Sequence, residues 1–101
     1  MERGILMYAR LVLFTLAEDD REFTDGMIKE FSGGLAQVPG FVDATFFADY
    51  DKLEFGAMVI WATREAADMA FERLNSRLAG ALQGRIVGEL RHPLYEVVDV
   101  S

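Results

Sequence analysis

The stretch Phe41–Thr63, FVDATFFADYDKLEFGAMVIWAT, decides the fold because it predicts two neighbouring antiparallel strands. Its first part, Phe41–Tyr50, alternates in part between apolar and polar residues, as a strand does. The polar segment Asp49–Lys52 then has the length of a hairpin connection. The second strand, Leu53–Thr63, is apolar at both parities in its centre, which predicts that both of its faces are buried.

A first helix is predicted before this hairpin. Four acidic residues open it, where the helix dipole favours negative charge: Glu18, Asp19, Asp20 and Glu22. Apolar residues then recur every four positions: Phe23, Met27, Phe31 and Leu35. Gly33 and Gly34 weaken this stripe, and they either end the helix early or allow it to approach the sheet closely. Pro39-Gly40 stops the helix.

A second helix, Arg64–Leu82, is predicted after the hairpin. Thr63 is placed to cap its first turn, and Gly80 and Gly84 mark its C-terminal end. Its apolar stripe has helical spacing: Ala67, Phe71, Leu74, Leu78 and Leu82. Polar residues occupy the opposite surface, which leaves one side of the helix to pack on the sheet.

The two ends of the chain supply the remaining strands. Ile5–Leu16 is apolar on both faces except at Arg10, and Ile86–Val100 predicts a last strand with a bend at His92-Pro93. The element order is therefore βαββαβ. This is the α+β, ferredoxin-like arrangement of a four-stranded antiparallel sheet with two helices on one face. A chain of 101 residues has room for one such domain.

The second face of this sheet predicts a partner. Two helices cover only one face, yet the first and third strands are apolar on both faces. Large exposed apolar patches are uncommon on monomers. A second copy related by two-fold symmetry would cover the open face. The strand pattern therefore predicts a homodimer.

The composition excludes several classes of function. Seventeen acidic against ten basic residues give a net charge of −7, which argues against nucleic acid and anionic membranes as partners. The chain has no cysteine, so disulfides, thiolate metal sites and cysteine nucleophiles are excluded. Because Arg10 interrupts the apolar N-terminal stretch, we interpret it as a strand instead of a signal peptide, and expect a cytoplasmic location.

Arg10 is the leading candidate for a functional residue. It shares one face of the first strand with Tyr8 and Phe14. An arginine on an apolar face is paired, lies at the surface or is aimed at an anionic group. Arg10 could hold a substrate phenolate or stabilise a developing oxyanion. Alternatively, it forms an ion pair with Glu89 or Glu96 of the last strand, or with a partner subunit.

Other candidates each have a structural alternative. His92 is a candidate general base, or a structural or exposed side chain, and a single histidine cannot build a multi-histidine metal site. Trp61 could donate its indole N–H to a substrate oxygen, or serve as a core aromatic. Asn75 could add a polar contact, or lie in solvent. Asp49 and Asp51 offer too few oxygens for calcium and predict a solvated turn, so no metal is expected.

The stretch Val38–Leu74 resembles the antibiotic-biosynthesis-monooxygenase-like (ABM) family of dimeric α/β barrels. The segments that carry the resemblance are Pro39-Gly40-Phe41, the WATREA run Trp61–Ala66 and the final PLYEVVDV, Pro93–Val100. These segments mostly fix turns and packing, so they mark the fold more than the function. The resemblance implies a dimer with one pocket between the sheet and the helices of each protomer.

The resemblance also implies an activity. Members of the family include cofactor-independent quinol monooxygenases and haem-degrading enzymes. The haem-degrading branch uses an asparagine on the first strand, and a tryptophan and an axial histidine on the second helix. This sequence has no asparagine in the first predicted strand and no tryptophan or histidine in the second predicted helix, so haem degradation is not expected.

We therefore expect a cofactor-independent monooxygenase-like protein that binds a small phenolic, quinol or polyketide-like aromatic molecule in an apolar pocket. Arg10 and His92 are the candidate catalytic residues. The candidate binding residues are Tyr8, Phe14, Trp61 and Asn75. The alternative is a non-catalytic dimeric module that binds small molecules or accompanies a stress response or a pathway. The five methionines and eight phenylalanines fit either a pocket for a planar ligand or the core of a dimer.

Overall fold

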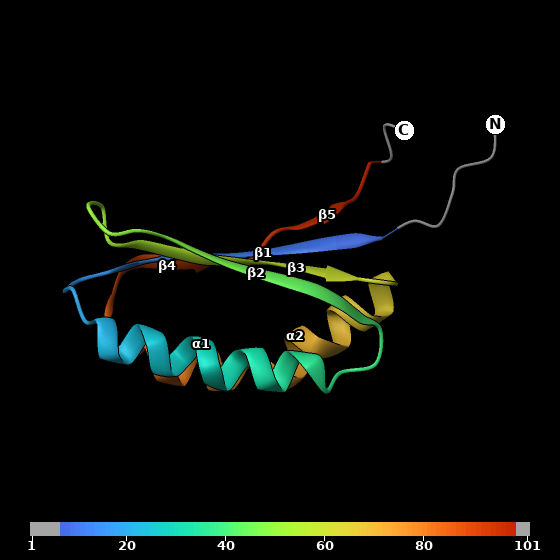
Figure 1. The fold of residues 1–101 in the computed structure, drawn as a ribbon, viewed down its shortest axis with the longest axis horizontal. Coiled ribbons are helices and arrows are strands. Elements are labelled where there is room, and N and C mark those ends of the chain that lie inside the picture. The colour runs from blue at the N-terminus through green and yellow to red at the C-terminus, as the bar shows by residue number, and fades with distance from the viewer. Residues whose placement is uncertain (1–6, 99–101) are drawn as a thin grey trace.

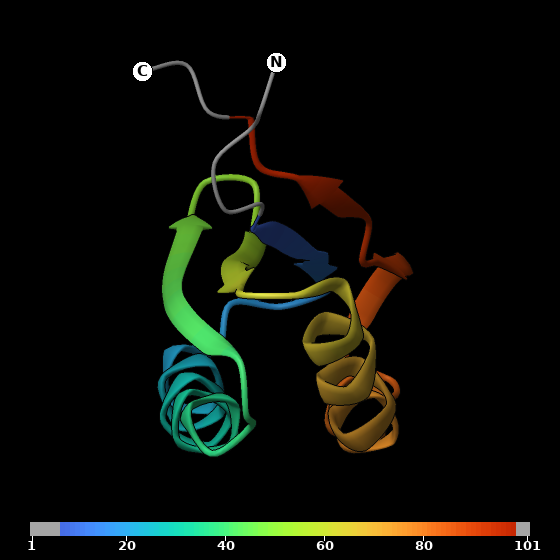
Figure 2. The same cartoon turned by 90° about the vertical axis from the view of Figure 1, so that its right-hand side faces the viewer.

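An antiparallel sheet carries both helices on one face in the computed structural model, which describes residues 7–98 (Figures 1 and 2). The element order confirms the predicted ferredoxin-like arrangement. The elements are β1 (Tyr8–Leu16), α1 (Arg21–Ala36), β2 (Phe41–Asp49), β3 (Glu54–Trp61), α2 (Arg64–Leu82), β4 (Ile86–Arg91) and β5 (Leu94–Glu96).

The sheet has the strand order β2-β3-β1-β4, and β5 also pairs with β1. The predicted last strand is therefore divided in two at His92-Pro93, because proline has no N–H for a strand ladder. The carbonyl of Pro93 still accepts a hydrogen bond from the Leu11 backbone N–H at 2.9 Å. The outer ends of the predicted terminal strands, residues 5–6 and 99–100, lie outside the described residues.

Both helices begin at the residues that their caps specify. The Asp20 carboxylate accepts a hydrogen bond from the Phe23 N–H at 3.0 Å, and the Thr63 hydroxyl accepts one from the Ala66 N–H at 3.0 Å. α1 continues through Gly33 and Gly34 to its end at Ala36. Within residues 7–98, neither helix combines the length and the apolar character needed to cross a membrane.

Of the glycine pair in α1, only Gly34 faces a residue of α2, and neither glycine faces the sheet. A Cβ atom added at Gly34 would lie 3.6 Å from a methyl carbon of Leu74 on α2, and one added at Gly33 would meet nothing within 4 Å. This corrects the expected approach to the sheet. At this distance an alanine at position 34 would make an ordinary van der Waals contact with the Leu74 side chain.

The hairpin between β2 and β3 is held by its first aspartate. One carboxylate oxygen of Asp49 accepts hydrogen bonds from the backbone N–H groups of Asp51 at 3.1 Å and Lys52 at 3.2 Å. This is the local pattern by which aspartate stabilises turns. The acidic residues of the hairpin therefore form the polar turn that the sequence predicts.

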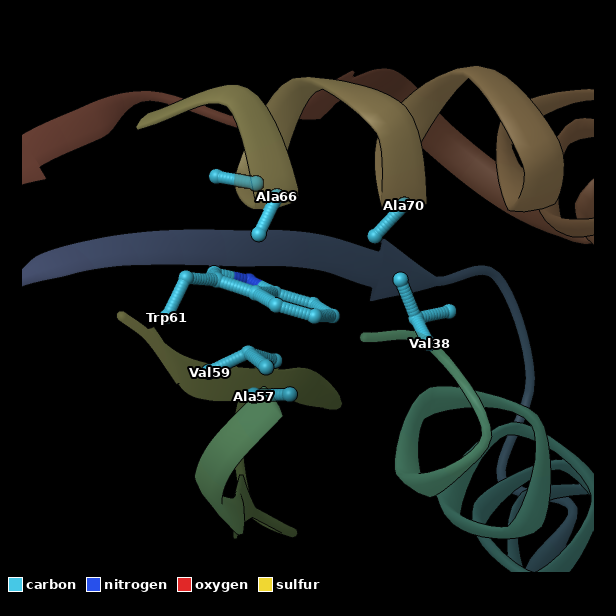
Figure 3. Close-up of a cluster of buried hydrophobic side chains, with 7 residues drawn as sticks. Val38, Ala57, Val59, Trp61, Ala66 and Ala70 are labelled. Carbon is cyan, nitrogen blue, oxygen red and sulfur yellow. The ribbon is translucent and has the colours of Figure 1, made fainter. Parts of the chain in front are cut away.

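Buried side chains gather between the sheet and the helices in two clusters. The larger one surrounds Trp61, whose side chain is 1% exposed and lies between α2 and β3 (Figure 3). Its members are Val38, Ala57, Val59, Trp61, Ala66, Ala67 and Ala70. The smaller cluster consists of Phe14, Leu16, Phe55 and Leu82. The three alanines on α2 let the helix lie close to the indole ring.

The face of the sheet that carries no helix is apolar as well. Leu11 on β1 pairs with Met58 on β3, and Leu13 pairs with Gly56, beside which Phe47 lies on β2. Met58 is 40% exposed and Phe47 is 43% exposed. The sequence pattern predicts this second apolar face, and the register shows that its residues form adjacent rows.

Candidate functional site

A cavity of about 100 Å³ lies between the sheet and the two helices, and its surface is almost entirely apolar. Met27 and Phe31 of α1 line one side, and Phe71 and Leu74 of α2 line the other. The two helices lie apart beneath the sheet, as the end-on view shows (Figure 2). An apolar cavity of about 150 Å³ is known to hold benzene. The volume here therefore suits a ligand of about one ring unless the helices move apart.

Four of the six predicted site residues line this cavity: Arg10, Phe14, Trp61 and Asn75. Tyr8 and His92 are not among its lining residues. The Tyr8 position pairs with Trp61 across β1 and β3, on the side of the sheet that the helices cover. His92 lies in the link between β4 and β5. The structure thus gathers most of the predicted residues at one place.

Arg10 is held at the end of the cavity by two partners. One terminal nitrogen, Nη2, lies 3.3 Å from a carboxylate oxygen of Asp68 on α2, and the other, Nη1, donates to the His92 carbonyl at 2.9 Å. Asp68 was not among the predicted ionic partners of Arg10, which were Glu89 or Glu96 of the last strand, or a partner subunit. Arg10 faces the helices, so its partner comes from the helix that packs over β1.

The third nitrogen of the Arg10 guanidinium is exceptional. Its Nε–H is buried and has no hydrogen-bond acceptor within the described part of the chain. Burial lowers the pKa of Arg10, whereas the charge and hydrogen bond of Asp68 raise it and the charge of Arg64 lowers it further. Arginine stays protonated in proteins despite such effects. Leaving a buried donor unpaired costs about 1–3 kcal/mol, and a ligand oxygen would relieve this cost once the side chains that cover Nε–H move aside.

Phe71 joins the two candidate catalytic residues. Its ring centroid lies 4.3 Å from that of His92, and the Arg10 guanidinium carbon lies 4.9 Å from the Phe71 centroid. Phe71 lines the cavity and His92 does not. Arg10 therefore lines the cavity itself. His92 contacts Phe71, which lines the cavity, but does not line the cavity itself.

Sequence reasoning missed two residues of this corner, Asp68 and Phe71. Together with Asn75 they recur at spacings of three and four residues, so all three lie on one side of α2. That spacing was the available signal. Phe71 was assigned only to the helical stripe, and of the two interpretations of the methionines and phenylalanines, Met27, Phe31 and Phe71 fit the pocket. All three line the cavity within a single chain.

Comparisons with known proteins identify the class of fold. No protein-family model matches the sequence, and the comparison with curated proteins gives no match. Solved structures do match over nearly the full chain. They confirm the predicted ferredoxin-like fold, which this chain shares with an oxygenase and a monooxygenase.

Three of these structures carry the likeness. A mutant of SnoaB, a cofactor-independent oxygenase from Streptomyces nogalater, is 21% identical with a TM-score of 0.76, over 93% of this chain and 95% of its own. The ActVA-Orf6 monooxygenase of Streptomyces coelicolor, solved with nanaomycin D, is 19% identical with a TM-score of 0.70, over 95% and 91%. A candidate antibiotic biosynthesis monooxygenase from Nitrosomonas europaea is 14% identical with a TM-score of 0.77, over 100% and 98%.

Proposed function

We propose that this protein is a cofactor-independent monooxygenase that binds a small phenolic, quinol or polyketide-like aromatic molecule in the cavity between sheet and helices. The observation that carries the proposal is the apolar cavity with the unpaired Arg10 Nε–H in its wall. The structural likeness to SnoaB and ActVA-Orf6, an oxygenase and a monooxygenase, supports it.

With an anthrone-type substrate, the reaction balances without an external reductant. A methylene carbon activated by adjoining rings or carbonyls is oxidised to a carbonyl as its two C–H bonds break. One atom of O₂ forms the new C=O bond, and the other leaves as water with both hydrogens. The substrate supplies all four electrons that reduce O₂. The protein's task is to exclude water, orient the substrate and stabilise negative charge on it.

Arg10 and His92 carry the proposed catalytic roles. The Arg10 Nε–H would donate to the substrate oxygen on which negative charge develops when the carbon loses its proton. His92 is the candidate base, and it would reach the substrate only after Phe71, against which its ring packs, turns aside. Both roles depend on contacts at one end of the cavity.

Three of the four candidate binding residues line the remaining space. Phe14 and Trp61 supply flat apolar walls, and Asn75 supplies an amide at the wall formed by α2. Tyr8 lies next to Trp61 in the register of the sheet, one row beyond Arg10. Dispersion contacts with the rings would supply most of the affinity, and the few polar groups would set the orientation.

The proposed assembly is a homodimer formed through the open face of the sheet. Met58 and Phe47 are large apolar side chains on this face, and both are more than one-third exposed in the single chain. Burying apolar surface stabilises an interface by about 25 cal/mol per Å². A second copy packed face to face would cover the open sheet face of both chains at once.

A second function is favoured by a different observation. Arg10 is compensated by Asp68, and Trp61 is fully packed among alanines and valines, so both residues already have structural roles. These contacts suit a non-catalytic dimeric module that binds a small aromatic molecule. Such a module would share the cavity and the dimer but would not consume oxygen.

Oxygen uptake with a panel of hydroquinones and anthrones tests the proposed enzyme. The wild-type protein should consume O₂ and place one labelled oxygen atom from ¹⁸O₂ in the product. Arg10→Met should lower kcat by about 100-fold, as removal of an oxyanion donor does. The matched control is Arg85→Met, because Arg85 pairs with Asp20 and lies over Phe23 but does not line the cavity. Ligand binding without any turnover across the panel would support the module instead.

A further inference from the structure

The charge at the Arg10 end of the cavity is already compensated. Arg10 is the only ionisable residue among those described that line the cavity. Its side chain is 13% exposed, and its ionic partner Asp68 lies 3.3 Å away with a side chain that is 55% exposed. The Arg10 cation is therefore mostly buried in the cavity wall, and the Asp68 carboxylate that balances its charge is exposed to solvent.

Two further groups near this corner can carry charge. Arg64, in the first turn of α2, lowers the pKa of Arg10 by its charge, so it lies within electrostatic reach. It is exposed and does not line the cavity, so water and salt screen it. His92 is also exposed, and its ring packs against the ring of Phe71. Neither residue offers a buried charge to a ligand.

The hydrogen bonds of Arg10 limit what it can bind. Nη1 donates to the His92 carbonyl and Nη2 lies against Asp68, so Nε is the one guanidinium nitrogen without a partner among the described residues. A carbonyl oxygen needs only one such donor. A carboxylate needs more, because it must leave water for an apolar cavity and would then lie near the like charge of Asp68.

We propose that Asp68 is a specificity-determining residue, which makes the cavity select uncharged aromatic molecules that bear a carbonyl and reject aromatic carboxylates. The inference rests on the proposed function in one respect, since it takes an aromatic molecule as the occupant of the cavity. Asp68 does not line the cavity and acts through Arg10. It is thus a positioning residue that also supplies repulsion against the wrong ligand.

A matched pair of ligands tests this selection. Acetophenone and benzoate have the same shape and the same number of non-hydrogen atoms, but only benzoate is charged at about pH 8. Trp61 is the single tryptophan of the chain and lines the cavity, so its indole N–H resonance in a ¹⁵N-correlated NMR spectrum reports occupancy. Titration of each ligand gives the two dissociation constants from the same signal.

The expected result separates charge from position. The wild-type protein should bind acetophenone at least tenfold more tightly than benzoate. Asp68→Asn keeps an oxygen that can accept from Arg10 but removes the charge, so benzoate should gain about tenfold while acetophenone changes less than threefold. The control is Asp20→Asn, which removes the same charge from the Arg85 pair and keeps a good helix cap. That control should leave both dissociation constants unchanged.

Two results would overturn the inference in distinguishable ways. Equal binding of the two ligands to the wild-type protein, or an unchanged preference in Asp68→Asn, removes the role of Asp68 while the aromatic cavity stands. No shift of the Trp61 resonance with either ligand, or with hydroquinone, removes the aromatic occupant and with it the proposed function. An intact dispersed NMR spectrum of Asp68→Asn shows that the variant is folded.

Discussion

The two faces of the sheet are both apolar, but they are used differently. On the helix-covered face, β3 contributes Phe55, Ala57, Val59 and Trp61, all less than one-tenth exposed. On the open face, the neighbouring Met58 is 40% exposed, although it lies in the same strand. The comparison shows that alternate residues of one strand differ in burial. One set forms the core and the cavity of a single chain, and the other set is the one that the proposed dimer would bury.

Removing Trp61 should have the largest effect, because it breaks the covered face at its centre. Trp61→Ala should lower the free energy of unfolding by about 3–5 kcal/mol, since the indole is surrounded by buried side chains. Urea unfolding followed by circular dichroism measures the loss. Tyr95→Ala on the open side of the sheet, where the ring is 55% exposed, is the control and should cost far less. Equal losses in both variants would contradict the distinction between the faces.

A charge on the open face should separate the proposed dimer. Met58→Glu would place a carboxylate in an apolar interface twice, because the interface is two-fold symmetric. The dimer dissociation constant should rise by about 100-fold, or about 2.7 kcal/mol. Light scattering after size-exclusion chromatography measures it. Met69→Glu is the matched control, since Met69 is 44% exposed on α2, away from this face. A wild-type protein that stays monomeric at micromolar concentration would refute the dimer.

Gly56 lies between Leu13 of β1 and Phe47 of β2 in the register of the sheet. An added Cβ would lie 2.5 Å from the Val12 carbonyl oxygen and 2.6 Å from the Phe47 ring. Gly56→Ala should therefore cost about 1–3 kcal/mol in thermal or urea unfolding, as overpacking does. Gly80→Ala on α2 meets nothing within 4 Å and should stabilise the helix by up to about 1 kcal/mol. Opposite signs in the two variants would confirm that Gly56 is required by its neighbours.

The smallest effect is expected at the start of α2. Thr63→Ala removes the hydroxyl that accepts the Ala66 N–H, and should cost about 1 kcal/mol. Thr63→Ser keeps the hydroxyl and should restore most of the stability. Because Ala66 belongs to the Trp61 cluster, the cap also helps to hold α2 against the covered face of the sheet. A loss that serine does not restore would mean that the threonine methyl group matters more than the cap.

Most of the fold could be predicted from periodicity and turn residues. The stripe from Phe23 to Leu35 and the capping position of Thr63 depend on near neighbours in sequence, and such signals are local. The break of the last strand into β4 and β5 follows from Pro93, whose ring removes a hydrogen-bond donor. These predictions needed no knowledge of how the helices cross the sheet.

The candidate site could be predicted only in part. The face of Arg10 followed from strand alternation, but its pairing with Asp68 joins residues that are 58 positions apart. That contact depends on where α2 crosses β1, which no local pattern specifies. The same reason explains why Phe71 was assigned to a helical stripe and not to the cavity wall. Side-chain type and parity identified the residues, and packing decided which of them meet.

The central place of β1 in the strand order bears on how the chain folds. β1 pairs with β3 on one side and with β4 and β5 on the other, so neither neighbour follows it directly in sequence. The β2–β3 hairpin is local and should form first, whereas contacts with large sequence separation form more slowly. Pulse-labelled hydrogen exchange should therefore protect β3 amides that bond to β2 before those of β1. During synthesis, β1 would lack its neighbours on one side until β4 and β5 have left the ribosome.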